Sequence, residues 1–298
     1  MPKNGLSKLG LGTVQFGLDY GISNKFGKTP LTEIERILDL ANQSGVTTLD
    51  TAHLYGDSEA VLGQAILDSH KFDIVTKTIS SRENGFGEVD LKTVEVGFCK
   101  SLSLLKVKSV YGILLHNAED LKSDNANLLY NLLGQFKRDQ LVKKIGVSVY
   151  DIEQINFILD HFSINLIQLP MNVFDQRLLQ NGVLEKIKRQ GIEIHVRSAF
   201  LQGLIFMQPE ELPEKLKSLS SKLQRFQNYV RDLNIHPAAA ALSFLMEQDV
   251  VDKVVCGVNS FDQFKTLIDL VSKLPKIDEK FFASLAVSNP AVVNPNNW

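Results

Sequence analysis

The chain has 298 residues, of which 44% are hydrophobic, and this is enough apolar material to bury a large core. Its 32 basic and 34 acidic side chains nearly balance, so it lacks the strongly basic character that nucleic-acid binding requires. No apolar run suits a signal sequence or a membrane span, and the two cysteines have no metal-ligand spacing. We therefore expect a cytoplasmic protein, a monomer or weak homo-oligomer, with no nucleic-acid or membrane partner.

Short apolar runs rich in β-branched residues alternate along the chain with amphipathic helical patterns. In chain order, the predicted strands cover residues 9–16, 47–51, 72–77, 110–116, 143–149, 165–170, 192–198 and 252–258. The predicted helices cover residues 31–45, 94–105, 125–138, 151–162, 183–191, 238–248 and 261–274. Gly45 stands where the first of these helices is expected to end.

Eight strands, most of them followed by a helix, are typical of an α/β fold of the (β/α)8 TIM barrel type. No linker divides the chain, so residues 1–298 are expected to form a single domain with its active site at the C-terminal ends of the strands. A doubly wound open sheet is the alternative. It is less favoured because the glycines at positions 10, 12 and 17 do not have the GxGxxG spacing of a dinucleotide-binding turn.

Ionisable side chains gather at consecutive strand ends. Asp50 ends the second predicted strand, Tyr55 lies in the loop after it, and Lys77 and His116 end the next two strands. Each alone has an ordinary interpretation, as a cap, a packing ring or a solvated charge. Together they suit proton transfer to a carbonyl oxygen that receives a hydride: the ammonium lowers the pKa of the phenol, the carboxylate holds the ammonium, and the imidazole orients the carbonyl.

The stretch "DTAHLYGDSE" at residues 50–59 has the pattern DTAxxYGxSE and resembles the corresponding motif of the aldo-keto reductases. The segments "IVTKT", "KKIGVSVY" and "IQLPMNVFD" follow in the same order, and the resemblance extends from about residue 9 to about residue 270. It implies that Asp50, Tyr55, Lys77 and His116 are the catalytic tetrad, with Tyr55 as the proton donor. It also implies reduction of an aldehyde or ketone by NADPH, with NADH as the second option. The polar loop at residues 18–30 and the tail at residues 290–298 suit a sugar-like carbonyl as well as a small aldehyde.

By the same resemblance, the nicotinamide cofactor lies across the barrel mouth. The residues assigned to it are Gly12, Thr13, Asp50, Ser148, Gln168, Arg197, Ser198, Phe200, Gly257, Asn259, Ser260 and Gln263. Val149 stands where the family has an asparagine, and Arg197 where many members place an aromatic ring under the nicotinamide. Gln263 replaces an arginine that often clamps the 2'-phosphate. Ser260 and Gln263 also form an S-x-x-Q capping box, so a structural role is equally well supported.

The substrate pocket is the least determined part of the site. Its candidate residues are Phe16, His53, Asn117, Asn172 and Arg177. Two other functions stay open: a cofactor-binding regulatory barrel with little turnover, and a metal-dependent barrel hydrolase that uses Asp50, His53 and His116. The hydrolase is less favoured, and no metal site is predicted, because the first strand has no H-x-H pair and no further carboxylate ligand is in sight.

Overall fold

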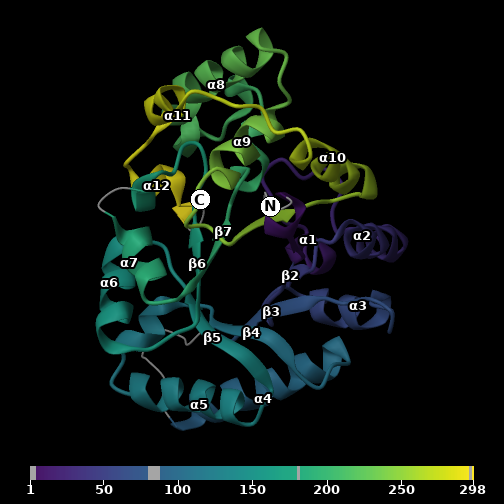
Figure 1. Cartoon of the computed structure of the whole chain (residues 1–298), viewed down its shortest axis with the longest axis vertical. Coiled ribbons are helices and arrows are strands. Elements are labelled where there is room, and N and C mark those ends of the chain that lie inside the picture. The colour runs from purple at the N-terminus through teal and green to yellow at the C-terminus, as the bar shows by residue number, and fades with distance from the viewer. Residues whose placement is uncertain (1–4, 80–87, 180–181, 295–296) are drawn as a thin grey trace.

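A computed structural model describes residues 5–79, 88–179, 182–294 and 297–298. Its centre is a closed barrel of eight parallel strands that follow one another in chain order (Figure 1). The strands are β1 (Leu9–Gly12), β2 (Thr48–Asp50), β3 (Asp73–Lys77), β4 (Val110–Leu115), β5 (Val142–Ser148), β6 (Leu166–Pro170), β7 (Glu193–Arg197) and β8 (Lys253–Gly257). Strand β8 pairs with β1, Leu9 opposite Val254, and this closes the ring. The predicted (β/α)8 barrel is confirmed.

Helices surround the barrel on its outside (Figure 1). Those of the main ring are α2 (Leu31–Ser44), α3 (Ser58–Ala65), α4 (Glu88–Leu105), α5 (Ala126–Arg138), α6 (Ile152–His161), α7 (Val183–Arg189), α9 (Pro237–Met246) and α10 (Phe261–Val271). Further helices are α1 (Val14–Gly17), α8 (Ser220–Asp232), α11 (Glu279–Leu285) and α12 (Pro290–Val293). Helix α11 packs on α8, so the C-terminal segment covers the helix that follows the β7 loop.

Helix α2 illustrates how the sequence pattern becomes structure. Its buried side chains are Ile34, Ile37, Leu38 and Ala41, which lie three or four residues apart and therefore form one apolar face. The helix ends at Gly45, whose φ of 76° is left-handed and suits glycine. The predicted stop at this residue is confirmed.

Helices α3, α8, α11 and α12 were not predicted, and one predicted strand is too long. Strand β1 ends at Gly12, and the residues after Thr13 form the short helix α1, so the prediction of a strand up to residue 16 is wrong there. In α8 the buried Leu223, Phe226 and Val230 have helical spacing, and this pattern is the signal that could have found it.

The strands bring polar side chains to one end of the barrel. Asp50, Lys77, Ser148, Arg197 and Gly257 are the last residues of their strands, and parallel strands end at the same rim. Below this rim, apolar side chains of the strands and of the inner helix faces form the core. Within the described ranges, no helix is long and apolar enough to cross a membrane.

Candidate active site

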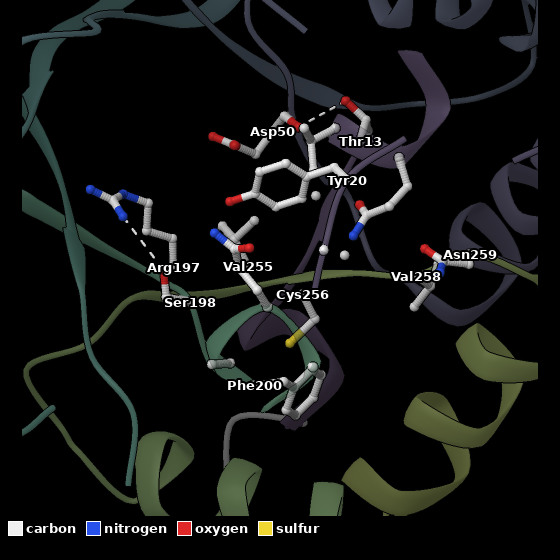
Figure 2. Close-up of a pocket in the computed structure, with 18 of the residues that line it drawn as sticks. Thr13, Tyr20, Asp50, Arg197, Ser198, Phe200, Val255, Cys256, Val258 and Asn259 are labelled. Carbon is white, nitrogen blue, oxygen red and sulfur yellow. Dashed lines mark hydrogen bonds between the residues drawn. The ribbon is translucent and has the colours of Figure 1, made fainter. Parts of the chain in front are cut away.

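A cavity of about 660 Å³ lies at the C-terminal ends of the strands (Figure 2). Strand ends supply Asp50, Lys77 and Arg197 to its lining, and the loop between β1 and α2 supplies Tyr20. The loop after β7 supplies Phe200. Such a cavity, apolar in part and with a few polar groups directed into it, is the usual form of a small-molecule site.

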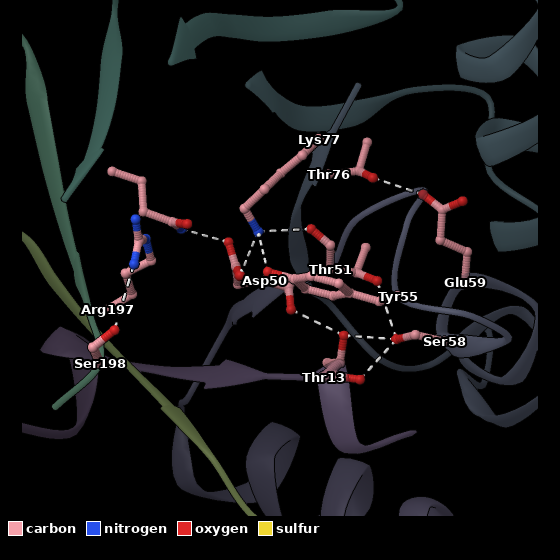
Figure 3. A network of polar contacts seen from close by, with 11 residues as sticks. Thr13, Asp50, Thr51, Tyr55, Ser58, Glu59, Thr76, Lys77, Arg197 and Ser198 are labelled. Atoms are coloured by element: carbon pink, nitrogen blue, oxygen red, sulfur yellow. Dashed lines mark hydrogen bonds and ion pairs between the residues drawn. The ribbon is translucent and has the colours of Figure 1, made fainter. Parts of the chain in front are cut away.

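Lys77 is the centre of the polar network on the cavity floor (Figure 3). Its side chain is 1% exposed, and Nζ donates to Asp50 Oδ1 at 2.7 Å and to the Thr51 carbonyl at 2.9 Å. The third donor position faces the Tyr55 hydroxyl at 3.3 Å. All three donors of the ammonium are therefore used, and one of them links the carboxylate to the phenol.

Asp50 is held from its other side as well. Gln168 Nε2 donates to Asp50 Oδ2 at 2.6 Å, which leaves Gln168 Oε1 buried with no partner among the described residues. His116 packs edge-on against Tyr55, with ring centroids 5.9 Å apart, and its Nδ1 is likewise buried without a described partner. Buried polar atoms normally have a hydrogen-bond partner, so two unpaired atoms beside one cavity indicate a ligand site.

The phenol of Tyr55 keeps its proton at neutral pH. Loss of hydration around its hydroxyl raises the pKa of Tyr55, and the positive charge of Lys77 offsets only part of this effect. The expected lowering by the ammonium is present, but burial is the larger effect, so the pKa of Tyr55 lies above its ordinary value. A phenol that is protonated at neutral pH still suits the role of a proton donor.

The two neighbours of Tyr55 differ in charge: Lys77 is positive and His116 is neutral. Burial works to lower the pKa of Lys77, but the Asp50 carboxylate and the Tyr55 phenol more than offset this, so its pKa is raised and it stays charged. Burial, together with the charge of Lys77, lowers the pKa of His116 to about 4. At pH 7 His116 is therefore a neutral imidazole that can donate one hydrogen bond and accept another.

Hydrogen bonds of Ser58 and Glu59, from the same DTAxxYGxSE motif, hold the segments that carry these side chains. Thr13 Oγ1 donates to the Asp50 carbonyl at 2.9 Å, and Ser58 Oγ donates to the Thr13 carbonyl at 2.9 Å. The buried Glu59 accepts a hydrogen bond of 2.6 Å from Thr76 Oγ1, which ties α3 to β3. These bonds fix the segments that carry Asp50, Tyr55 and Lys77 relative to one another.

Most residues expected at the cofactor line this cavity. They are Gly12, Thr13, Asp50, Ser148, Gln168, Arg197, Ser198, Phe200, Gly257, Asn259 and Gln263. Ser260 is the exception, because its hydroxyl accepts a hydrogen bond from the Gln263 amide and caps α10. The Gln263 side chain accepts from the Asn259 amide at 2.8 Å instead of from Ser260, so the expected capping box is only half formed.

The N-terminus of α10 carries an acidic partner that the sequence did not reveal. Glu33, from the first turn of α2, accepts a hydrogen bond of 2.8 Å from the Phe261 amide. This hydrogen bond is the main cause of a lowered pKa at Glu33. Arg36 covers the Phe261 ring at 4.0 Å and pairs with Glu33. One amide of this helix end is thus already used, which weakens it as a site for a cofactor phosphate.

The five residues expected in the substrate pocket do not line the cavity. Phe16 is buried in the core, and His53 Nδ1 lies 3.3 Å from a serine hydroxyl of α4. Asn117 caps a short 3-10 turn. Asn172 is buried, and its Oδ1 accepts hydrogen bonds from two backbone amides. Arg177 forms a 2.7 Å ion pair with Asp175. Local contacts therefore hold these side chains, although Asn172 Nδ2 is buried without a described partner.

Other residues, which sequence reasoning missed, do line the cavity. Examples are Gln15, Tyr20, Tyr150, Phe206 and His236. Tyr20 lies in the loop after the first strand, and loops at that end of a barrel form the site, so its position was the available signal. Tyr150 follows the strand-end serine by two residues and lines the same cavity, as alternation in an extended segment predicts.

Residues 8–288 match the model of the Aldo/keto reductase family. The chain belongs to this family. This chain is 28% identical to aldo-keto reductase YhdN of Bacillus subtilis over 291 residues, which covers 89% of this chain and 85% of that protein. It is 22% identical to D-arabinose 1-dehydrogenase of Saccharomyces cerevisiae over 262 residues, with coverages of 79% and 76%.

Solved structures share the barrel. The holo form of aldo-keto reductase AKR11C1 from Bacillus halodurans matches with a TM-score of 0.75 at 21% identity, over 98% of this chain and 95% of that one. Its apo form matches with a TM-score of 0.73 at 22% identity over the same shares. Family membership makes this aldo/keto reductase an oxidoreductase of the NAD(P)H-dependent class.

Proposed function

We propose that this aldo/keto reductase reduces an aldehyde or ketone to an alcohol, with NADPH as the cofactor and Tyr55 as the proton donor. The observation that supports this best is the contact of the Lys77 ammonium with both Asp50 and the Tyr55 hydroxyl at the cavity floor. A protonated phenol beside a fixed cation is suited to giving up its proton when charge develops on a nearby oxygen.

When bound, a nicotinamide cofactor would provide the hydride that the carbonyl carbon accepts in the proposed reaction. The Tyr55 hydroxyl donates its proton to the carbonyl oxygen as negative charge develops there. The Lys77 ammonium then stabilises the phenolate that remains, and Asp50 holds Lys77 charged and in place. Gln168 fixes the second oxygen of Asp50, so the carboxylate cannot turn away from the ammonium.

His116 serves as a hydrogen-bonding group. Its pKa of about 4 leaves it neutral, so it is a poor candidate for the acid at neutral pH. Its ring lies against Tyr55 and has an unpaired nitrogen, and such a ring can orient a carbonyl oxygen toward the phenol.

Several residues fit a nicotinamide nucleotide. Gln168 Oε1 and Gln15 Oε1 are buried without a described partner, and each can accept a hydrogen bond from a carboxamide. We place Ser148 beside Gln168 in this role. At Gly257 a Cβ would meet Gln15 Oε1 at 2.6 Å, so glycine lets the Gln15 side chain lie against the backbone there.

The preference for NADPH over NADH is proposed to be modest. At the α10 end of the cavity the lining includes Asp262 and Gln263 but no lysine or arginine among the described residues. Lys25 lies in an adjoining groove with Gln263 and is the cation best placed to meet a 2'-phosphate.

The substrate is proposed to be a small polar carbonyl compound, and a sugar-like aldehyde fits best. Tyr20 and Tyr150 bring phenol groups to the lining. Such groups hydrogen-bond hydroxyl-bearing molecules. The yeast relative is named for oxidation of the sugar D-arabinose, which is in line with this class.

The two alternatives have less support. A metal hydrolase would need Asp50, His53 and His116 around one ion, but His53 does not line the cavity and bonds to α4. A regulatory barrel would need the tetrad to be inactive, whereas all four side chains are in mutual contact range.

The test is NADPH oxidation, followed by absorbance, with a panel of sugar-like and simple aldehydes and ketones. We expect turnover that does not change with a chelator. Cofactor binding without turnover of any carbonyl would favour the regulatory barrel, and absence of both NADPH binding and NADPH oxidation would favour the hydrolase.

A further inference from the structure

Arg197 has an unusual electrostatic position. It is the last residue of β7 and lines the cavity together with Tyr55 and His116. Its guanidinium lies over the Tyr150 ring at 4.2 Å. It donates hydrogen bonds to the Val149 carbonyl and to the Ser198 hydroxyl, both 3.4 Å long and both to neutral acceptors. Among the described residues it forms no ion pair.

The charges that line the cavity leave this guanidinium uncompensated. The described lining contains four charged side chains, those of Asp50, Lys77, Arg197 and Asp262. Asp50 and Lys77 neutralise each other at 2.7 Å. Asp262 lies in the first turn of α10, at the other end of the lining. The reacting end therefore carries about one unpaired positive charge, whose field opposes the burial that raises the pKa of Tyr55 and adds to the burial that lowers the pKa of His116.

A nicotinamide ring changes charge when it reacts. The ring is neutral in the reduced cofactor and positive in the oxidised one, whereas the phosphates are the same in both. The ring must lie beside the carbonyl group that Tyr55 protonates, and so within the field of Arg197, whichever face it presents. A nearby fixed cation therefore penalises the oxidised form alone.

We propose that Arg197 makes this site bind the reduced cofactor more tightly than the oxidised cofactor, and so promotes release of the oxidised form after each reduction. This inference rests on the proposed function. For unit charges about 8 to 12 Å apart at an effective dielectric constant of about 20, Coulomb's law gives an effect of roughly tenfold to thirtyfold in affinity.

The test is calorimetric titration of the purified protein with NADP+ and with NADPH, for wild type and variants. Arg197→Gln and Arg197→Met remove the charge with side chains of comparable reach, and Arg197→Lys keeps it. Arg138→Gln on α5 is the control for loss of an exposed arginine, since its bonds are to a neighbouring glutamine. The measured quantity is the ratio of the two dissociation constants, because effects on the phosphates cancel in it.

We expect wild type, Arg197→Lys and Arg138→Gln to bind NADPH about tenfold or more tightly than NADP+, and both neutral variants to bring the ratio close to one. A ratio that stays at the wild-type value in Arg197→Gln and Arg197→Met would overturn the inference. So would a wild-type ratio near one. Failure of wild type to bind either nucleotide would instead refute the proposed function.

Discussion

Replacing Lys77 by methionine removes the cation that connects Asp50 with Tyr55 and keeps most of the side-chain volume. Lys77 and Asp50 are buried, with side chains 1% and 5% exposed, and Lys77 Nζ lies 2.7 Å from Asp50 Oδ1. Removing one member of such a pair leaves the other charge buried, which typically costs about 3–5 kcal/mol. A domain with a free energy of unfolding of about 5–15 kcal/mol should still fold.

Catalysis should suffer independently of stability. Without the ammonium, the phenolate that Tyr55 would become has no cation beside it, so reduction should fall at least about a hundredfold, or about 2.7 kcal/mol in transition-state energy. Single-turnover reduction at saturating NADPH measures this loss, and denaturant unfolding measures the stability. Asp50→Asn in the same chain should recover part of the stability, because it removes the uncompensated carboxylate.

Lys144→Met is the matched control. Lys144 pairs with Glu193 near the opposite end of the barrel, and its side chain is 29% exposed. We expect a loss of about 1 kcal/mol in stability, in the range of partly exposed pairs, and unchanged turnover. Near-normal turnover in Lys77→Met, or an equal loss of turnover in Lys144→Met, would refute the reasoning.

Three further outcomes are expected. Asp262→Asn removes a carboxylate from the α10 end of the cavity and should raise the preference for NADPH over NADH, which we expect to be about tenfold in wild type. Titration of both reduced cofactors by their own fluorescence measures this preference, and a lowered preference would contradict the expectation. His116 has a pKa of about 4 when folded and 6.5 as its ordinary value, so stability should fall by about 2 kcal/mol from pH 7 to pH 5, and His116→Gln should lose that part of the slope in denaturant unfolding. Gly203 and Ser23 both line the cavity, Gly203 has a φ of +89°, and a Cβ there would overlap the Ser23 hydroxyl. Gly203→Ala should therefore displace this part of the lining and weaken NADPH binding, and an unchanged calorimetric affinity would contradict this.

The barrel and the four grouped side chains were predictable for a physical reason. Buried parallel strands appear in the sequence as short apolar runs, and their ends converge at one rim. Asp50, Lys77 and His116 stand at the ends of such runs, and Tyr55 follows the second by a few residues. Their meeting in space follows from the topology alone.

The walls of the cavity were not predictable in the same way. The directions of Phe16 and Asn172 depend on the turns in which they lie, and one belongs to the helix α1 that replaces the end of a predicted strand. The bond between Glu33 and Phe261 joins residues 228 positions apart, with no local pattern to indicate it. The raised pKa of Tyr55 depends on burial, which spacing in a sequence does not reveal.

The central claim is that Tyr55 acts in chemistry and not in cofactor binding, and the Tyr55→Phe variant tests it most directly. The substitution deletes one hydroxyl, whose described hydrogen bond is to Lys77, and leaves the ring against His116. NADPH affinity and carbonyl reduction should be measured on the same preparation, affinity by calorimetry. The account predicts NADPH binding within about threefold of wild type, or about 0.7 kcal/mol, together with loss of almost all reduction. Wild-type turnover, or loss of cofactor binding, would contradict it.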